Sequence, residues 1–125
     1  MTKQKNEDER SSSHHALVQV DLEFPRFQDD LAKLTLERLL QVRACVDNIR
    51  KITWAQILAT SSKRQKRGLN WEVLNQKTAC GSVVASIRVT DKFRARVTRD
   101  GVYMRFISLH PDHGSTYKEP GGEAL

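Results

Sequence analysis

The chain has 125 residues, enough for one domain with a modest core, and its 21 lysines and arginines against 15 acidic residues give a formal net charge of +6. Two cysteines, Cys45 and Cys80, are too few for a disulfide scaffold or a metal knuckle, so both are predicted to be small, partly buried side chains in a reducing compartment. No window approaches the ~18 apolar residues of a membrane span, and the first residues lack the apolar stretch of a signal peptide, so we expect a cytoplasmic protein with no membrane partner.

Polar segments lie at both ends of the chain. Residues 1–15 contain no apolar residue after Met1, and residues 118–125 carry one proline and two glycines. Segments of this composition cannot bury enough apolar surface to offset the entropy lost on ordering. We therefore predict a disordered tail over 1–15, one domain over 16–117 and a flexible tail over 118–125.

The first third of this domain has the pattern of a strand followed by helices. Residues 17–24 alternate loosely between apolar and polar side chains, which predicts a strand. Pro25 suits the first turn of a helix, where its missing N–H is no loss. Apolar residues then recur at helical spacing over residues 27–49, which fits either one long helix or two helices with a break near Thr35.

A short helix and a basic loop follow. Thr53 and Gln56 have the spacing of a capping box, which predicts a short helix that ends near Ala59. Residues 60–70 are polar and basic and are predicted to form a loop, while residues 71–74 form an apolar patch whose structure stays open.

Three strands are predicted in the second half, over residues 83–90, 93–98 and 102–109. Between the first two, a two-residue loop would mix the two faces of the sheet, whereas a three-residue loop over residues 90–92 pairs Arg88 with Arg94 and keeps the faces separate. We prefer the three-residue loop.

The last two strands are joined by Asp100-Gly101, a strong signal for a two-residue hairpin loop. With these two residues as the loop, Arg99 faces Val102, and Arg96 faces Arg105. Apolar side chains then share one face of the sheet, which can receive the helices.

The other face is predicted to be cationic. Like charges that oppose each other in a sheet are destabilising, and solvated arginines on an outer face remain the alternative interpretation. Because two Arg–Arg pairs are predicted, we favour an anion-binding surface, and phosphate suits the planar donors of guanidinium groups. The four residues are Arg88, Arg94, Arg96 and Arg105.

Two imidazoles and a phenol follow the last strand, at His110, His113 and Tyr117. Histidine is the commonest general acid or base, and cleavage of RNA by a 2′-OH needs an acid, a base and cationic stabilisation of the phosphate. Alternatively, the histidines cap a loop or lie in solvent, and Tyr117 only pins the C-terminal segment onto the sheet. Since the sequence shows no further cluster of metal ligands beside these histidines, no metal is expected.

The order of these elements resembles the RelE/ParE superfamily of toxins. Residues 86–96 are similar to that family's paired strands, written R-[LV]-x-x-x-[YF]-R, with Arg88 and Arg94 at the two arginines. The resemblance covers about residues 17–117. It implies an α+β fold, with an N-terminal strand and helices packed on an antiparallel sheet that ends in a three-stranded meander.

The resemblance also implies a toxin of a toxin–antitoxin pair that cleaves mRNA on the ribosome, with an antitoxin, mRNA and rRNA as partners and no cofactor. Arg94 corresponds to the arginine that contacts the scissile phosphate, and Tyr117 to a terminal catalytic tyrosine. His110 and His113 fall where members place basic or imidazole groups. A basic loop that contacts rRNA or mRNA in many members corresponds to Lys63, Arg64, Lys66 and Arg67.

Two other functions stay open. One is a ParE-type inhibitor of DNA gyrase that has no catalytic activity, and the other is a basic nucleic-acid-binding module that has lost toxicity. The His-x-x-His-x-x-x-Tyr ending favours the endoribonuclease, because an inhibitor needs no acid–base pair. Under each nucleic-acid-binding hypothesis the predicted contacts are Lys63, Arg64, Lys66, Arg67, Arg88, Arg96 and Arg105.

Overall fold

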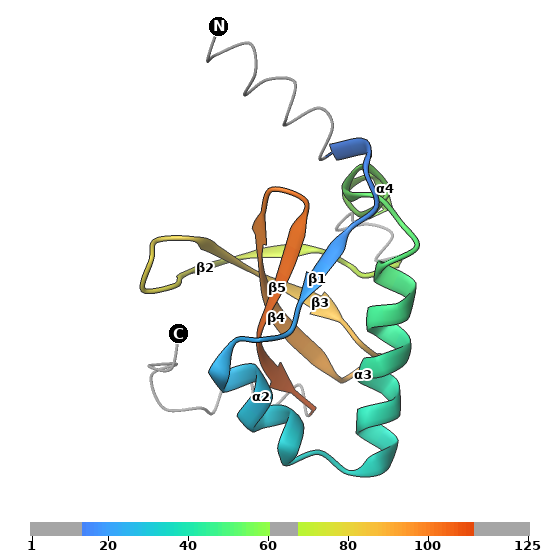
Figure 1. The fold of residues 1–125 in the computed structure, drawn as a ribbon, viewed down its shortest axis with the longest axis vertical. Helices are drawn as coiled ribbons and strands as arrows, with labels where there is room; N and C mark the ends of the chain where they lie inside the picture. Colours follow the sequence, from blue (N-terminus) through green and yellow to red (C-terminus); the bar gives the residue numbers. More distant parts are fainter. Residues whose placement is uncertain (1–13, 61–67, 112–125) are drawn as a thin grey trace, which may run out of the picture.

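A computed structural model describes residues 14–60 and 68–111, which form an α+β fold (Figure 1). Most of the two predicted tails, and the centre of the predicted basic loop, lie outside the described residues. In chain order the elements are β1 (Gln19–Asp21), α2 (Pro25–Ala32), α3 (Leu36–Ile49), α4 (Trp54–Thr60), β2 (Glu72–Lys77), β3 (Val83–Arg88), β4 (Arg94–Asp100) and β5 (Tyr103–His110).

The strands form one five-stranded sheet in the order β1-β5-β4-β3-β2. Strands β2 to β5 are antiparallel neighbours, so the predicted meander of three strands gains β2, which contains most of the apolar patch at 71–74. The α+β class is confirmed. The sheet is mixed and not purely antiparallel, because β1 pairs with β5 in parallel. Helices α2 to α4 and strands β2 to β4 lie between these two strands in the chain.

The first strand is shorter than predicted. It pairs with β5 only over Gln19–Asp21, and the side-chain Oδ1 of Asp21 then accepts a hydrogen bond from the backbone N–H of Glu23 at 3.0 Å. This Asx turn leads the chain out of the sheet and into α2, which has Pro25 in its first turn as predicted. The local turn thus ends the strand before its apolar alternation ends.

Of the two possibilities left open for residues 27–49, the structure has two helices. Thr35 lies in extended conformation between them, and its Oγ1 accepts a hydrogen bond from Arg38 N at 3.3 Å, as an N-cap does. The capping box of α4 also forms: Thr53 N donates to Gln56 Oε1 at 2.8 Å, and Gln56 N donates to Thr53 Oγ1 at 3.1 Å.

The helices cover one face of the sheet and bury a core between them. Phe27 of α2 packs edge-to-face on Phe106 of β5, with ring centroids 5.4 Å apart. Trp54 of α4 is fully buried, donates its Nε1–H to the carbonyl of Val102 at 3.0 Å, and lies 4.4 Å below the guanidinium of Arg99. Burying an aromatic side chain of this size stabilises the fold by ~2–3 kcal/mol, so these contacts fix how β4 and β5 sit against the helices.

The predicted hairpin between β3 and β4 is confirmed. Arg88 pairs with Arg94 across the two strands, and Val89 N donates to the carbonyl of Phe93 at 2.8 Å, which leaves residues 90–92 as the loop. Phe93 N donates to Thr90 Oγ1 at 3.3 Å and closes this loop from inside.

The predicted register between β4 and β5 is wrong by two residues at the hairpin. Asp100 pairs with Tyr103 and Arg99 with Met104, so Gly101-Val102 forms the loop, with Gly101 at a φ of 60°. The carbonyl of Val102 accepts hydrogen bonds from Gln19 N at 3.1 Å and from Trp54 at 3.0 Å. The Val102 carbonyl therefore accepts hydrogen bonds from the chain at β1 and from α4, and it does not pair with Arg99 as predicted.

Candidate functional site

All four predicted arginines lie on the face of the sheet that is opposite the helices, which we call the outer face. Their neighbours along β3, β4 and β5 belong to the helix-side core, so alternation places the arginines outside it. Two further pairings differ from the prediction: Arg96 faces Ser108, and Arg105 faces Thr98. Only one of the two predicted Arg–Arg pairs therefore forms, between Arg88 and Arg94.

A β-bulge in β5 determines which side chains of β5 share the outer face with these arginines. Val97 pairs with Phe106 and Arg96 with Ser108, so Ile107 has no partner on β4. Phe106 and Leu109 both belong to the helix-side core, whereas Ile107 does not. The extra residue therefore reverses the alternation and places Ser108 and His110 on the outer face.

The bulge completes a row of three nitrogen-rich side chains across three strands. Arg94 of β4 pairs with Arg88 of β3 on one side and with His110 of β5 on the other. Neighbouring strands are ~4.8 Å apart, so the three side chains leave the sheet side by side. We call Arg88, Arg94 and His110 the cationic row.

Arg94 is the member of the row whose hydrogen-bonding capacity is least used. Its Nε and Nη1 are buried, and neither has a hydrogen-bond partner among residues 14–60 and 68–111. A buried donor without a partner costs ~1–3 kcal/mol, and more when the group is charged. An anion bound at the row would satisfy these donors and offset the repulsion between Arg94 and Arg88.

His110 is positioned by a neighbour on its own strand. Its Nε2 lies 2.9 Å from the hydroxyl oxygen of Ser108, and the two side chains are 1% and 0% exposed. Either atom can donate in this hydrogen bond, depending on the imidazole tautomer. The pair can therefore hold or pass a proton next to Arg94, while its burial keeps the ring out of direct contact with solvent.

The other two outer-face arginines lie in different surroundings. Arg105 Nε donates to Asp21 Oδ2 at 2.8 Å, and its Nη2 lies 3.7 Å from Asp100 Oδ2. The hydrogen bond from Arg105 lowers the pKa of the Asp21 carboxyl, with a further hydrogen bond from the backbone of Glu23. The charge of Arg105 is thus balanced by two carboxylates. Arg96, in contrast, is buried and lies between Ser86 and Ser108 of the flanking strands.

Several predicted site residues lie outside the described residues: His113 and Tyr117 after β5, and Lys63, Arg64, Lys66 and Arg67 in the basic loop. Two further residues that shape the site were not predicted from the sequence. Ser108 gave no motif, although the adjacent apolar residues Phe106 and Ile107 break the alternation and so mark the bulge. Asp30 gave no signal, and its Oδ2 accepts a hydrogen bond from Leu109 N at 2.9 Å.

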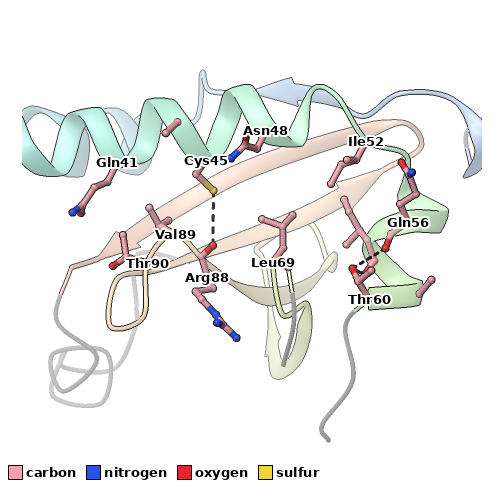
Figure 2. A pocket seen from close by; sticks show the side chains of 14 residues that line it. Gln41, Cys45, Asn48, Ile52, Gln56, Thr60, Leu69, Arg88, Val89 and Thr90 are labelled. Atoms are coloured by element: carbon pink, nitrogen blue, oxygen red, sulfur yellow. Dashed lines mark hydrogen bonds between the residues drawn. The ribbon is translucent and has the colours of Figure 1, made fainter. Parts of the chain in front are cut away.

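A cavity of about 660 Å³ lies on the helix side of the sheet, between α3, α4 and the end of β3. Figure 2 shows Cys45 pointing from α3 toward the carbonyl of Arg88, to which its Sγ is 3.9 Å away, and the Arg88 side chain directed away from α3. Burial raises the pKa of the Cys45 thiol to about 11. The cavity is thus separated by the sheet from the cationic row, and its thiol is held in the unreactive protonated form.

Residues 14–60 and 68–111 contain no group of three or more His, Cys, Asp or Glu side chains that could hold a metal ion. In the same ranges no helix combines the length and the apolar composition needed to cross a membrane. The fold and the site define an α+β protein with a basic sheet face. The chain matches no protein-family model, no curated protein and no solved structure.

Proposed function

We propose that this protein is a RelE/ParE-like toxin of a toxin–antitoxin pair, and that it cleaves mRNA on the ribosome with the cationic row as its phosphate site. The observation that carries the proposal is the pairing of Arg94 with both Arg88 and His110 on the outer face. The planar donors of guanidinium groups suit the oxygens of a phosphodiester, and an imidazole suits proton transfer in its cleavage. The row supplies both within three adjacent strands.

In this proposal each described residue has a separate task. Arg94 donates its unpartnered Nε–H and Nη1–H to the non-bridging oxygens of the scissile phosphate and stabilises the charge that builds up as the 2′-oxygen attacks. Arg88 adds a second positive charge beside it. As the 2′-oxygen bonds to phosphorus, the bond from phosphorus to the 5′-oxygen breaks; His110 takes the proton of the 2′-OH or gives one to the departing 5′-oxygen, and Ser108 hydrogen-bonds its ring. By resemblance, His113 and Tyr117 complete the acid–base set.

The proposed partners follow from the same assignment. A net charge of +6 and a basic sheet face favour binding to RNA, which supports mRNA and rRNA as partners in the cytoplasm. An antitoxin encoded beside the toxin is part of the proposal, and no cofactor is required for attack by a 2′-OH.

The test is induction of the chain in bacteria, followed by primer extension on a reporter mRNA. Wild type is compared with Arg94→Ala, with His110→Gln, and with Arg105→Ala as a matched control whose arginine is engaged by Asp21. We expect growth arrest with cuts in frame, a loss of cutting of ~100-fold or more for the first two variants, and retained cutting for the control. Growth arrest without cuts would point to a gyrase-type inhibitor and would overturn the proposal.

One observation favours a second candidate, a nucleic-acid-binding module without catalysis. His110 is 1% exposed and already hydrogen-bonded to Ser108, an arrangement that also suits a purely structural histidine. This candidate predicts normal growth and intact mRNA on induction, together with RNA binding that weakens in steps when Arg88 or Arg94 is replaced.

A further inference from the structure

Beyond Arg105, no strand among residues 14–60 and 68–111 pairs with β5 on the side away from β4. The parallel strand β1 pairs only with residues 103–105, because the chain leaves the sheet after Asp21 and enters α2. Helix α2 lies beside the end of β5 instead (Figure 1). There the side chain of Asp30 takes the place of a missing strand, and its Oδ2 accepts the backbone N–H of Leu109 at 2.9 Å.

This hydrogen bond is made at Leu109, one of the residues whose side-chain direction depends on the bulge. Leu109 faces the helix-side core and His110 the outer face only because Ile107 is unpaired. A regular ladder through Ile107 would turn Leu109 outward and His110 toward the helices, since a one-residue slip moves every side chain to the opposite face. The hydrogen bond to Asp30 holds the N–H of Leu109 on the open edge of β5 and so opposes that slip.

A carboxylate suits this position better than a neutral acceptor. Hydrogen bonds from a backbone N–H to an ionised carboxylate are about twice as strong as neutral ones. The same Oδ2 lies 3.6 Å from Arg26 Nε, one helical turn earlier, and the two side chains are only 18% and 19% exposed. Arg26 therefore holds the carboxylate of Asp30 toward β5, and α2 is tied to the end of the strand that carries His110.

We propose that Asp30 is the positioning residue of the cationic row: through Leu109 N it keeps the bulged end of β5 in the register that places His110 beside Arg94. Its effect on RNA rests on the proposed function, whereas its effect on the position of His110 does not. Asp30 itself contacts no member of the row, and it acts through the backbone of β5.

The experiment compares wild type with Asp30→Ala, Asp30→Asn and, as a matched control, Asp29→Ala, which replaces the neighbouring exposed aspartate. Amide hydrogen exchange of Leu109 and the ring resonances of His110 are measured by NMR on the full chain. Affinity for a short single-stranded RNA is measured by fluorescence anisotropy at fixed salt. Circular dichroism establishes that each variant is folded.

For Asp30→Ala we expect exchange of the Leu109 amide to accelerate by about 10-fold or more, as the loss of a charge-assisted hydrogen bond predicts, together with shifted His110 resonances. Asp30→Asn retains an acceptor oxygen, so its Leu109 exchange rate and its His110 resonances should both lie closer to those of wild type than in Asp30→Ala. It also serves as the folded test protein if the alanine variant does not fold. Asp29→Ala should match wild type. Unchanged His110 resonances in folded Asp30→Ala, or in Asp30→Asn if only that variant folds, would overturn the proposal.

The RNA measurement separates this inference from the function on which it partly rests. If wild type binds RNA, Asp30→Ala should bind about 10-fold more weakly, and Asp30→Asn should regain part of the loss. If wild type does not bind RNA while Asp30→Ala still moves His110, the proposed function fails and the role of Asp30 stands.

Discussion

Arg94 and His110 are direct cross-strand partners on the outer face of the sheet, one at the start of β4 and the other at the end of β5. The unpaired residue Ile107 brings them to the same face, and Asp30 of α2 accepts a hydrogen bond from the backbone N–H of Leu109, the residue before His110. A cation and an imidazole thus stand side by side at the point where the described part of β5 ends. Because Arg94 lies beside Arg88 and His110 on this face, replacing it should affect RNA binding and stability differently.

Replacing Arg94 by glutamine should weaken RNA binding without weakening the fold. The substitution removes a like-charge neighbour of Arg88 and the buried donors that lack partners, so the free energy of unfolding should stay constant or rise by a few tenths of a kcal/mol. The slope of log affinity against log salt should fall by about 1, as expected for one lost phosphate contact. Urea denaturation and anisotropy at several salt concentrations measure the two quantities.

Arg105→Gln is the control for this prediction. It breaks the ion pair with Asp21, so it should lower stability by roughly 0.2–1 kcal/mol. Its effect on the salt slope should be small. A salt slope that falls equally in both variants would contradict the separate role given to Arg94.

The Asp21–Arg105 pair should make stability depend on pH at the acid end. The hydrogen bond from Arg105 lowers the pKa of Asp21 in the folded protein below its ordinary value of 3.8. The pair therefore contributes fully above about pH 4, and its contribution is lost as the pH falls through the lower folded pKa. Because both side chains are partly exposed, the contribution is roughly 0.2–1 kcal/mol.

Chemical denaturation between pH 2 and pH 6 measures this effect. Asp21→Asn should lower stability at pH 6 and flatten the acid limb of the stability curve. Asp29→Asn, at an exposed position of α2, should leave the limb unchanged. An acid limb in Asp21→Asn as steep as in wild type would show that other carboxyl groups cause it.

Trp54→Phe should destabilise the protein by about 1–3 kcal/mol. The phenyl ring keeps most of the apolar burial but loses the hydrogen bond to the carbonyl of Val102 and weakens the stacking of Arg99. Urea denaturation provides the measurement. Tyr103→Phe, at a side chain 49% exposed, is the control and should change stability by less than about 0.5 kcal/mol.

The two cysteines should differ sharply in reactivity. Cys45 is buried and its pKa is raised to about 11, so at pH 8 almost none of it is the reactive thiolate, whereas Cys80 is exposed. Iodoacetamide followed by mass spectrometry should label Cys80 in the native protein and Cys45 only after unfolding. Equal labelling rates in the native protein would contradict the burial of Cys45.

Several local features could be predicted from the sequence. The start of α2 at Pro25, the capping box of Thr53 and Gln56, and the loop over residues 90–92 all agree with the structure. Each depends on hydrogen bonds or steric limits between residues a few positions apart, and such interactions are the same in any fold. The outward placement of the four arginines followed from alternation along their own strands, which does not depend on the exact partner across the hairpin.

The arrangement of the site was decided only in the tertiary structure. Val102 is held in the loop by Gln19 and Trp54, and Leu109 is held by Asp30, 79 residues earlier in the chain. Alternation along one strand cannot reveal such partners, because they come from elements that meet only when the helices pack on the sheet. The sequence by itself therefore determined most of the elements, but not β2 or the separation of α2 from α3, and it determined which side chains are cationic. Packing determined the bulge at Ile107, and with it whether His110 faces the core or Arg94.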